Sequence, residues 1–223
     1  MKKPGLWKRF SDLVSDHSPL MTRVGQVSLL VVCNLCWLVC SIPVVTIGAS
    51  TTALYAVLLE RRNLSFDAAL GAFFRAFRRH WRTATTLWLP ALALGLIWLA
   101  AAWLTAAQGL LNNAFALLPL LVSGAVWSFV VQWAFPLLAA GCRGAGPVLR
   151  KAFLLGMGEL WRSAVALAVD CIPVVLFLLY AQTFMILMGF WLLLGYALIA
   201  LVKLLVIEPV LRRHTPLGKQ SPP

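Results

Sequence analysis

Charged residues are scarce in this chain, and acidic residues are the scarcest. Only 12% of the 223 residues are Asp, Glu, Lys or Arg, and seven of these are acidic. Soluble domains carry roughly 25% charged residues, so this chain has too little polar surface to face water on all sides. Hydrophobic residues make up 61% of the sequence. The composition therefore predicts an integral membrane protein.

Three long stretches contain almost no charge. They cover residues 24–59, 83–142 and 163–202, and Asp170 is the one charged residue within them. A helix needs about 20 residues to cross the hydrocarbon layer, so each of the two longer stretches can hold two spans. The first stretch is ambiguous. It holds either two short spans or a hairpin that re-enters the membrane over residues 44–59.

Positive charge is abundant by contrast, with 19 Lys and Arg and a net charge of +12. All but Lys203 fall in residues 2–23, 61–82, 143–162 and 212–219. Loops rich in Lys and Arg stay in the cytoplasm. We therefore expect an all-α polytopic protein with about six hydrophobic segments, paired as three hairpins, and with both termini cytoplasmic. Basic residues that alternate with apolar runs in this way do not indicate nucleic-acid binding.

Each uncharged stretch follows a short basic, amphipathic segment. Such segments form helices that lie at the membrane interface with their cations toward anionic lipid headgroups. The pattern indicates either a threefold internal repeat or the general preference for Trp and Arg where helices enter a membrane. We expect one membrane domain over residues 1–215 and a disordered tail over residues 216–223.

Polar residues interrupt the first uncharged stretch. Proline ends or bends a helix, and small residues three and four apart let helices approach closely. One interpretation is a tightly packed hairpin in which hydroxyls bond to backbone carbonyls, and the other is a polar lining for a substrate or a peptide partner. The residues concerned are Pro43, Thr46, Gly48, Ser50, Thr51, Thr52 and Tyr55.

Four other polar residues lie within the apolar spans. Asp170 is a candidate for a structural pair with Lys203, for a protonated carboxyl, or for a relay of protons or substrate. Asn34 and Gln132 are candidates for joining helices through their amides. The cysteines at positions 33, 36 and 40 share one helical face and suit packing, and no catalytic, metal or cofactor site is predicted.

One stretch resembles a known family. Asn34, Trp37, the sequence SIPVVTIGASTTALY over residues 41–55, and Glu60 are similar to the YesL-like family of bacterial integral membrane proteins, a domain of unknown function. The resemblance implies a small polytopic protein of the bacterial plasma membrane, often encoded beside sugar-uptake genes. The family has no established activity, so no catalytic residues are implied.

Two functions follow from these observations as expectations. The first is a non-enzymatic accessory or regulatory partner of a carbohydrate importer or its sensor, as a monomer or a homo-oligomer. The alternative is a small secondary transporter, a permease-like protein with a polar intramembrane site. A transporter predicts polar groups that converge within the membrane, whereas an accessory protein predicts a packed interior and an exposed partner surface. An enzyme is disfavoured, because no nucleophile, base and metal set is visible.

Overall fold

The computed structural model describes residues 19–61, 64, 66–110, 113–186 and 188–215. Every regular element within these ranges is helical, which confirms the all-α expectation. Most of the first basic segment and the expected tail lie outside the described residues. The elements are α2 (Pro19–Cys40), a 3₁₀ turn (Val44–Thr46), α3 (Ile47–Glu60), α4 (Phe66–Ala107), α5 (Ala114–Ala139), α6 (Ala145–Gly158), α7 (Leu160–Leu179), α8 (Ala181–Ile186), α9 (Met188–Phe190), a π-helical turn (Trp191–Gly195) and α10 (Tyr196–His214).

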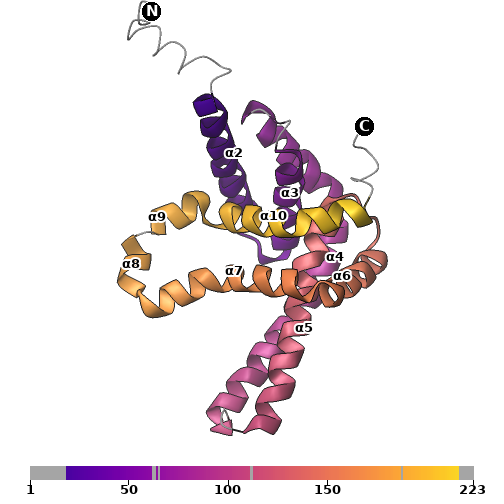
Figure 1. The fold of residues 1–223 in the computed structure, drawn as a ribbon, viewed down its shortest axis with the longest axis vertical. Coiled ribbons are helices and arrows are strands. Elements are labelled where there is room, and N and C mark those ends of the chain that lie inside the picture. Colours follow the sequence, from indigo (N-terminus) through magenta and orange to yellow (C-terminus); the bar gives the residue numbers. More distant parts are fainter. Residues whose placement is uncertain (1–18, 62–63, 65, 111–112, 187, 216–223) are drawn as a thin grey trace, which may run out of the picture.

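The turn between α2 and α3 is built around Pro43. Proline lacks an amide hydrogen and does not continue a helix, and α3 runs back beside α2 (Figure 1). The Thr46 hydroxyl donates to the carbonyl oxygens of Cys40 at 2.6 Å and Pro43 at 2.8 Å. The Trp88 indole N–H donates to the carbonyl oxygen of Val44 at 2.8 Å. Side chains therefore satisfy backbone acceptors that a turn leaves free.

Gly48 lets α3 approach α4 closely. A Cβ atom at this position would lie 2.6 Å from Trp88 Cβ and 2.9 Å from the carbonyl oxygen of Ala84. Both distances are well inside van der Waals contact, so a larger residue does not fit without moving a helix. Almost all of α3 is buried as a result, including residues 48–55.

The basic segment before the second uncharged stretch is not a separate helix. It forms the first part of α4, which is continuous over 42 residues, whereas α6 is a separate helix before α7.

Four helical stretches are long and apolar enough to cross a membrane, and two shorter apolar helices precede them. This fits an integral membrane protein. The four stretches are Ala68–Ala107, Ala114–Ala139, Leu160–Leu179 and Met188–His214, and the shorter two are Gly25–Cys40 and Val44–Glu60.

Two reciprocal tryptophan contacts join α4 to α5. The indole N–H of Trp98 donates to a carbonyl of α5 at 2.9 Å, and that of Trp127 donates to a carbonyl of α4 at 3.0 Å. Each ring covers a glycine of the other helix. An added Cβ would lie 2.7 Å from the Trp98 ring at Gly124 and 2.8 Å from the Trp127 ring at Gly95. The hairpin is therefore closely packed where no other element covers it.

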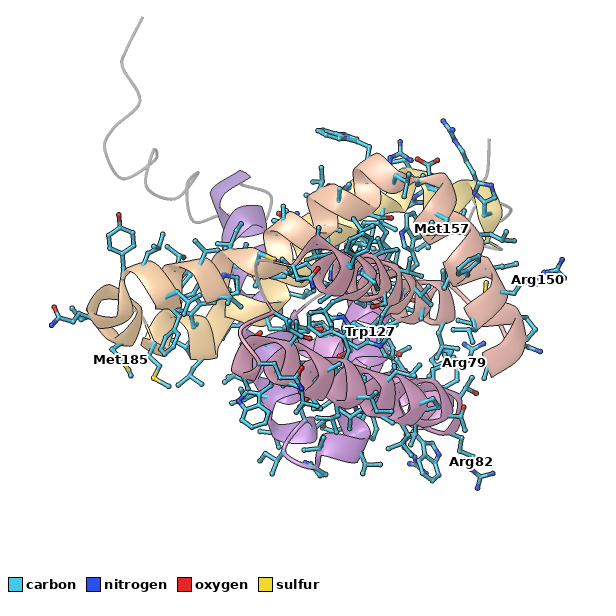
Figure 2. The ribbon with its side chains drawn as sticks, turned by 90° about the horizontal axis from the view of Figure 1, so that it is seen from below. Arg79, Arg82, Trp127, Arg150, Met157 and Met185 are labelled. Atoms are coloured by element: carbon cyan, nitrogen blue, oxygen red, sulfur yellow. The ribbon has the colours of Figure 1, made fainter. Side chains whose placement is uncertain are left out.

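The two long hairpins leave the core in different directions. Figure 1 shows α4 and α5 extending downward, while α7 and α10 run across this direction toward α8 and α9. The outer ends expose large apolar side chains, such as Phe115 at 92% and Ile186 at 83%. In Figure 2, Met185 lies at one end of the molecule and Arg79, Arg82 and Arg150 lie at the other. The structure thus has a basic end, opposite the apolar outer end of the α7–α10 hairpin.

Candidate functional site

A cavity of about 290 Å³, lined by both polar and apolar surface, lies where the long helices meet. Residues from α2, α3, α4, α5, α7 and α10 line it, so the site is assembled only when these elements pack together. Its apolar lining is Ile47, Val131 and Phe135. Its polar and amphipathic lining consists of Trp37, Thr51, Tyr55, Trp88, Gln132, Asp170, Tyr196 and Lys203.

Asp170 on α7 and Lys203 on α10 form an ion pair at this cavity. The Lys203 Nζ donates to Asp170 Oδ2 at 2.7 Å. The lysine side chain is 9% exposed and the aspartate side chain is 35% exposed, so the ammonium is the more deeply buried partner. The two charges cancel, and the pair therefore adds polarity to the cavity without adding net charge.

Trp37 on α2 and Tyr196 on α10 form an aromatic wall of the cavity. Their ring centroids are 3.8 Å apart and the ring planes differ by 13°. The Trp37 indole N–H donates to Thr51 Oγ1 at 3.1 Å, and the Tyr196 hydroxyl lies 3.5 Å from the same oxygen. Thr51 therefore links the stacked rings to α3 and fixes their orientation.

Gln132 on α5 is the unsatisfied polar group of the site. The residue is 7% exposed, and neither its Nε2 nor its Oε1 has a hydrogen-bond partner in the part of the chain that the structure describes. An unsatisfied buried polar group costs about 1–3 kcal/mol, so such groups are uncommon in folded proteins. Gln132 lines the cavity, but its amide nitrogen and oxygen are themselves buried, so a bound solute can pair with them only after the side chain turns toward the cavity.

Asn34 has a different role, because both ends of its amide are bonded. Its Nδ2 donates to the carbonyl oxygen of Leu192 at 2.7 Å, and its Oδ1 accepts from the backbone N–H of Ala197 at 2.8 Å. These two backbone groups lie on either side of the end of the π-helical turn. Single π-helical turns within α-helices are frequent at functional sites. Asn34 therefore holds the start of α10 against α2 and positions Tyr196.

The hydroxyl cluster that follows α2 divides into two groups. Thr46, Ser50 and Thr52 donate to backbone carbonyls of their own turn or helix. Thr51 faces the cavity, and Tyr55, one turn further along α3, lines it too. Bonding of hydroxyls to backbone carbonyls is therefore observed for three residues, while a lining for a substrate or partner stays a prediction for Thr51 and Tyr55.

Sequence reasoning missed part of the lining. Tyr196 and Trp88 were not selected, although a tyrosine inside an apolar stretch is a usable signal because its hydroxyl needs a partner. Six selected residues do not line the cavity. Pro43 shapes the turn and Gly48 lies at the contact of α3 with α4. The other four bond to backbone groups, and they are Asn34, Thr46, Ser50 and Thr52. Among the residues with described positions, no three His, Cys, Asp or Glu side chains form a metal-binding group.

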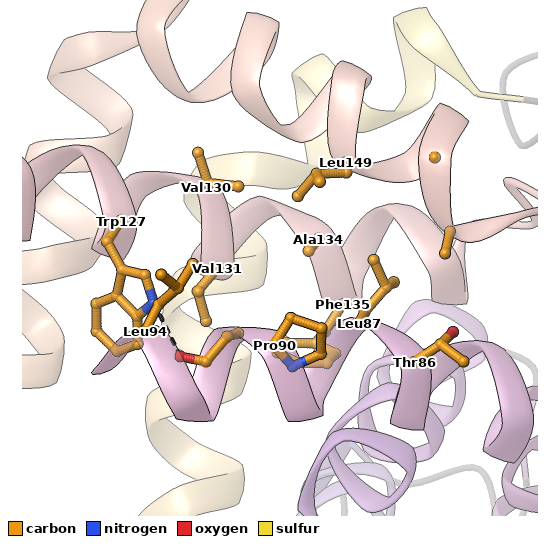
Figure 3. A pocket seen from close by; sticks show the side chains of 13 residues that line it. Thr86, Leu87, Pro90, Leu94, Trp127, Val130, Val131, Ala134, Phe135 and Leu149 are labelled. Atoms are coloured by element: carbon orange, nitrogen blue, oxygen red, sulfur yellow. Dashed lines mark hydrogen bonds between the residues drawn. The ribbon is translucent and has the colours of Figure 1, made fainter. Parts of the chain in front are cut away.

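A second hollow, of about 210 Å³, lies between α4, α5 and α6 and is almost entirely apolar. Figure 3 shows Pro90 and Leu94 of α4, Val130 of α5 and Leu149 of α6 around it. Its polar groups are the Thr86 hydroxyl and an indole N–H, and both donate to carbonyls of α4. This hollow therefore offers nothing that would orient a polar solute.

Comparison with known proteins finds a similarity to one family over part of the chain and no activity. Residues 30–101 match the model of a family described as a protein of unknown function, DUF624. The match agrees with the resemblance of this region to a family of unknown function. It includes α3 and excludes α5, α7 and α10, which supply Gln132, Asp170 and Lys203. No curated protein and no solved structure matches the chain.

Proposed function

We propose that this chain is a non-enzymatic, permease-like protein of the bacterial plasma membrane that binds a small polar solute in its central cavity. The observation that carries the proposal is the buried amide of Gln132, which has no partner among the described residues and belongs to a residue that lines the same cavity as the Asp170–Lys203 pair. Polar groups from six helices converge there. That convergence is what a transporter requires and what a packed accessory protein does not need.

The lining indicates a neutral or zwitterionic solute that is rich in hydroxyl groups. The ion pair contributes no net charge, and Gln132, Thr51 and Tyr55 offer both donors and acceptors. The stacked Trp37 and Tyr196 rings add flat apolar surface. A cavity of about 290 Å³ is at the small end of ligand sites. Monosaccharides satisfy all of these requirements.

We predict that Gln132→Leu abolishes solute binding while leaving the fold intact. The substitution removes an unsatisfied buried amide, which stabilises the empty protein, but it also removes the donor and acceptor offered to the solute. The thermal unfolding midpoint should be measured in detergent with a panel of neutral monosaccharides, polyols and amino acids. At least one solute should stabilise the parent protein and not the variant.

Gln108→Leu is the matched control, because Gln108 is exposed at the end of α4, far from the cavity lining. It should retain the stabilisation by solute. If no member of the panel stabilises the parent protein, or if both variants respond equally, the solute site is contradicted and an accessory function becomes the better account.

The second candidate is an accessory or regulatory partner of a carbohydrate importer or its sensor. It is favoured by the divergence of the α4–α5 and α7–α10 hairpins, whose exposed apolar ends offer surface to another membrane helix or to a second copy of the chain. The resemblance to the YesL-like family supports the link to sugar uptake. The two functions are compatible if the solute controls the association.

We propose four full crossings with both termini in the cytoplasm, an arrangement in which the α4–α5 and α7–α10 hairpins, which run across each other in Figure 1, turn into line within the membrane. On each of α4, α7 and α10, a cavity residue is followed or preceded by an arginine that lies nearer the basic end. The two residues are six positions apart on α4, eight on α7 and nine on α10. At 1.5 Å per residue these spacings equal about 9–14 Å, close to half of the ~30 Å hydrocarbon layer. The cavity is then near the middle of the membrane. The pairs are Trp88 and Arg82, Asp170 and Arg162, and Lys203 and Arg212.

In this arrangement α2 and α3 form a re-entrant hairpin. Gly48 at the start of α3 contacts Trp88, while Glu60 at its end lines the same hollow as Arg75. The helix therefore extends from the cavity back toward the basic end of α4, and does not follow α4 toward Ala107. Irregular backbone within the hydrocarbon needs internal hydrogen bonds, and the turn before α3 has them.

Cysteine labelling tests the re-entrant hairpin. In a variant with its five native cysteines replaced by alanine, we predict that Ile42→Cys is not modified by a membrane-impermeant maleimide added outside intact cells. Gln108→Cys, at the outer end of α4, should be modified under the same conditions. Outside labelling at position 42 would mean that the first hairpin crosses completely. Reporter fusions after residues 144 and 223 should report cytoplasm.

A further inference from the structure

A third hollow, of about 310 Å³, lies at the basic end of the molecule and is lined largely by polar groups. It is formed by the end of α3, the first part of α4 and the end of α5. Short alanine side chains leave this space open, and charged side chains surround it. The alanines are Ala56, Ala72, Ala76 and Ala139, and the polar lining consists of Glu60, Arg75, Arg79 and His80.

The two arginines of this hollow form no ion pair with any residue that the structure describes. Arg75 and Arg79 are four residues apart, so their side chains project from the same face of α4. Neither has a carboxylate within 4.0 Å among the described residues. Other arginines of the structure do find partners, since Arg61 and Arg212 both pair with Glu208. The hollow therefore presents two guanidinium groups whose donors are available to a ligand.

The net charge of the lining is positive. Glu60 opposes two guanidinium groups and forms no ion pair in the described structure, and the His80 imidazole adds a hydrogen-bonding group. Guanidinium groups bind phosphate oxygens in a bidentate manner, which makes arginine the preferred residue for such ligands. An anion with several oxygens matches this hollow better than a neutral solute does.

We infer that this hollow is a binding site for a phosphate group, supplied by the headgroup of an anionic phospholipid. Its location favours this ligand, because Arg79 and His80 lie within one helical turn of Thr83, where the uncharged stretch of α4 begins. Basic pockets at that level of a membrane protein hold lipid headgroups. The site is separate from the central cavity and shares none of its lining residues.

Glu60 limits the affinity of this site. Its carboxylate lines the same hollow as the guanidinium groups and repels an incoming phosphate. The two kinds of charge therefore predict opposite effects of substitution. Arg79→Gln weakens phosphate binding, and Glu60→Gln strengthens it.

Thermal unfolding of the full chain in a neutral detergent tests the site. Midpoints are measured against rising amounts of phosphatidylglycerol, of phosphatidylcholine, or of glycerol 3-phosphate as a soluble phosphate ester. We expect phosphatidylglycerol to stabilise the parent protein at lower concentration than phosphatidylcholine. Arg79→Gln should raise the half-saturating concentration of phosphatidylglycerol about tenfold, the effect of losing one charge-assisted contact. Glu60→Gln should lower it.

Arg78→Gln is the matched control, because Arg78 is exposed on the same helix and does not line the hollow. Arg79 is exposed as well, so the two variants differ in whether the lost charge lines the hollow. Arg78→Gln should therefore change the half-saturating concentration by less than about twofold. An Arg79-dependent response to glycerol 3-phosphate alone supports the phosphate site and assigns it to a soluble ligand. Equal effects of Arg78→Gln and Arg79→Gln, or no stabilisation of the parent protein by any of the three compounds, would overturn the inference.

Discussion

Gly48→Leu is expected to lower the thermal unfolding midpoint sharply, whereas Gly25→Leu should leave it close to that of the parent protein. At Gly48 even a Cβ atom would lie 2.6 Å from Trp88 Cβ and 2.9 Å from the Ala84 carbonyl oxygen. Neither neighbour is the flexible end of a side chain, so α3 must move away from α4. Overpacking of this kind costs about 1–3 kcal/mol.

Gly25 provides the control because it is also helical and has nothing within 4 Å of an added Cβ. Both substitutions gain the same helix propensity, so the difference between the midpoints isolates the contact with α4. Midpoints are measured in one detergent by the loss of monodisperse protein on heating. Equal midpoints would show that α3 and α4 do not depend on this close approach.

The same substitution is expected to impair the central cavity. Thr51 lies less than one helical turn beyond Gly48, and its hydroxyl oxygen accepts from Trp37 at 3.1 Å. A shift of α3 therefore disturbs the aromatic wall as well as the helix contact. Solute-dependent stabilisation should be lost in Gly48→Leu and retained in Gly25→Leu.

The sequence predicted the helical class because uncharged stretches of this length have few alternatives in a membrane. It did not predict that the basic segment before Thr83 is continuous with the apolar part of α4. No proline or glycine separates Arg75 from Thr83, so no local signal ends the helix there. Pro90 lies further along and remains within α4. Charge marks the expected edge of the membrane, but it does not mark the end of a helix.

The candidate site was only partly predictable. Asp170 and Lys203 were paired from sequence because charges are so rare in the uncharged stretches that each has few possible partners. Asn34 and Gln132 looked alike in sequence, yet one is fully bonded and the other has no partner among the described residues. That difference depends on how α10 and α5 pack, and no local pattern encodes it. Tyr196 became part of the site through the same packing.

The Asp170–Lys203 pair leads to the second large effect. Asp170→Asn is expected to destabilise the protein more than Lys203→Met does. Only 9% of the lysine side chain is exposed, so losing the carboxylate leaves a buried ammonium without its partner. Breaking a fully buried ion pair in this way costs about 3–5 kcal/mol, and the cost here is smaller because the aspartate side chain is partly exposed. The aspartate side chain is 35% exposed. In Lys203→Met the unpaired carboxylate therefore still has access to solvent, and the loss of stability is smaller.

The double variant Asp170→Asn/Lys203→Met separates pairing from two independent roles. If the two groups stabilise the fold as a pair, the double variant should be more stable than Asp170→Asn alone, because no uncompensated charge remains. Unfolding midpoints of the parent, the two single variants and the double variant form a double-mutant cycle, and a coupling of at least about 1 kcal/mol is expected for groups in direct contact. Additive effects would contradict the pair. A double variant that folds but no longer responds to any solute would show that the cavity needs these charges for binding, beyond their contribution to stability.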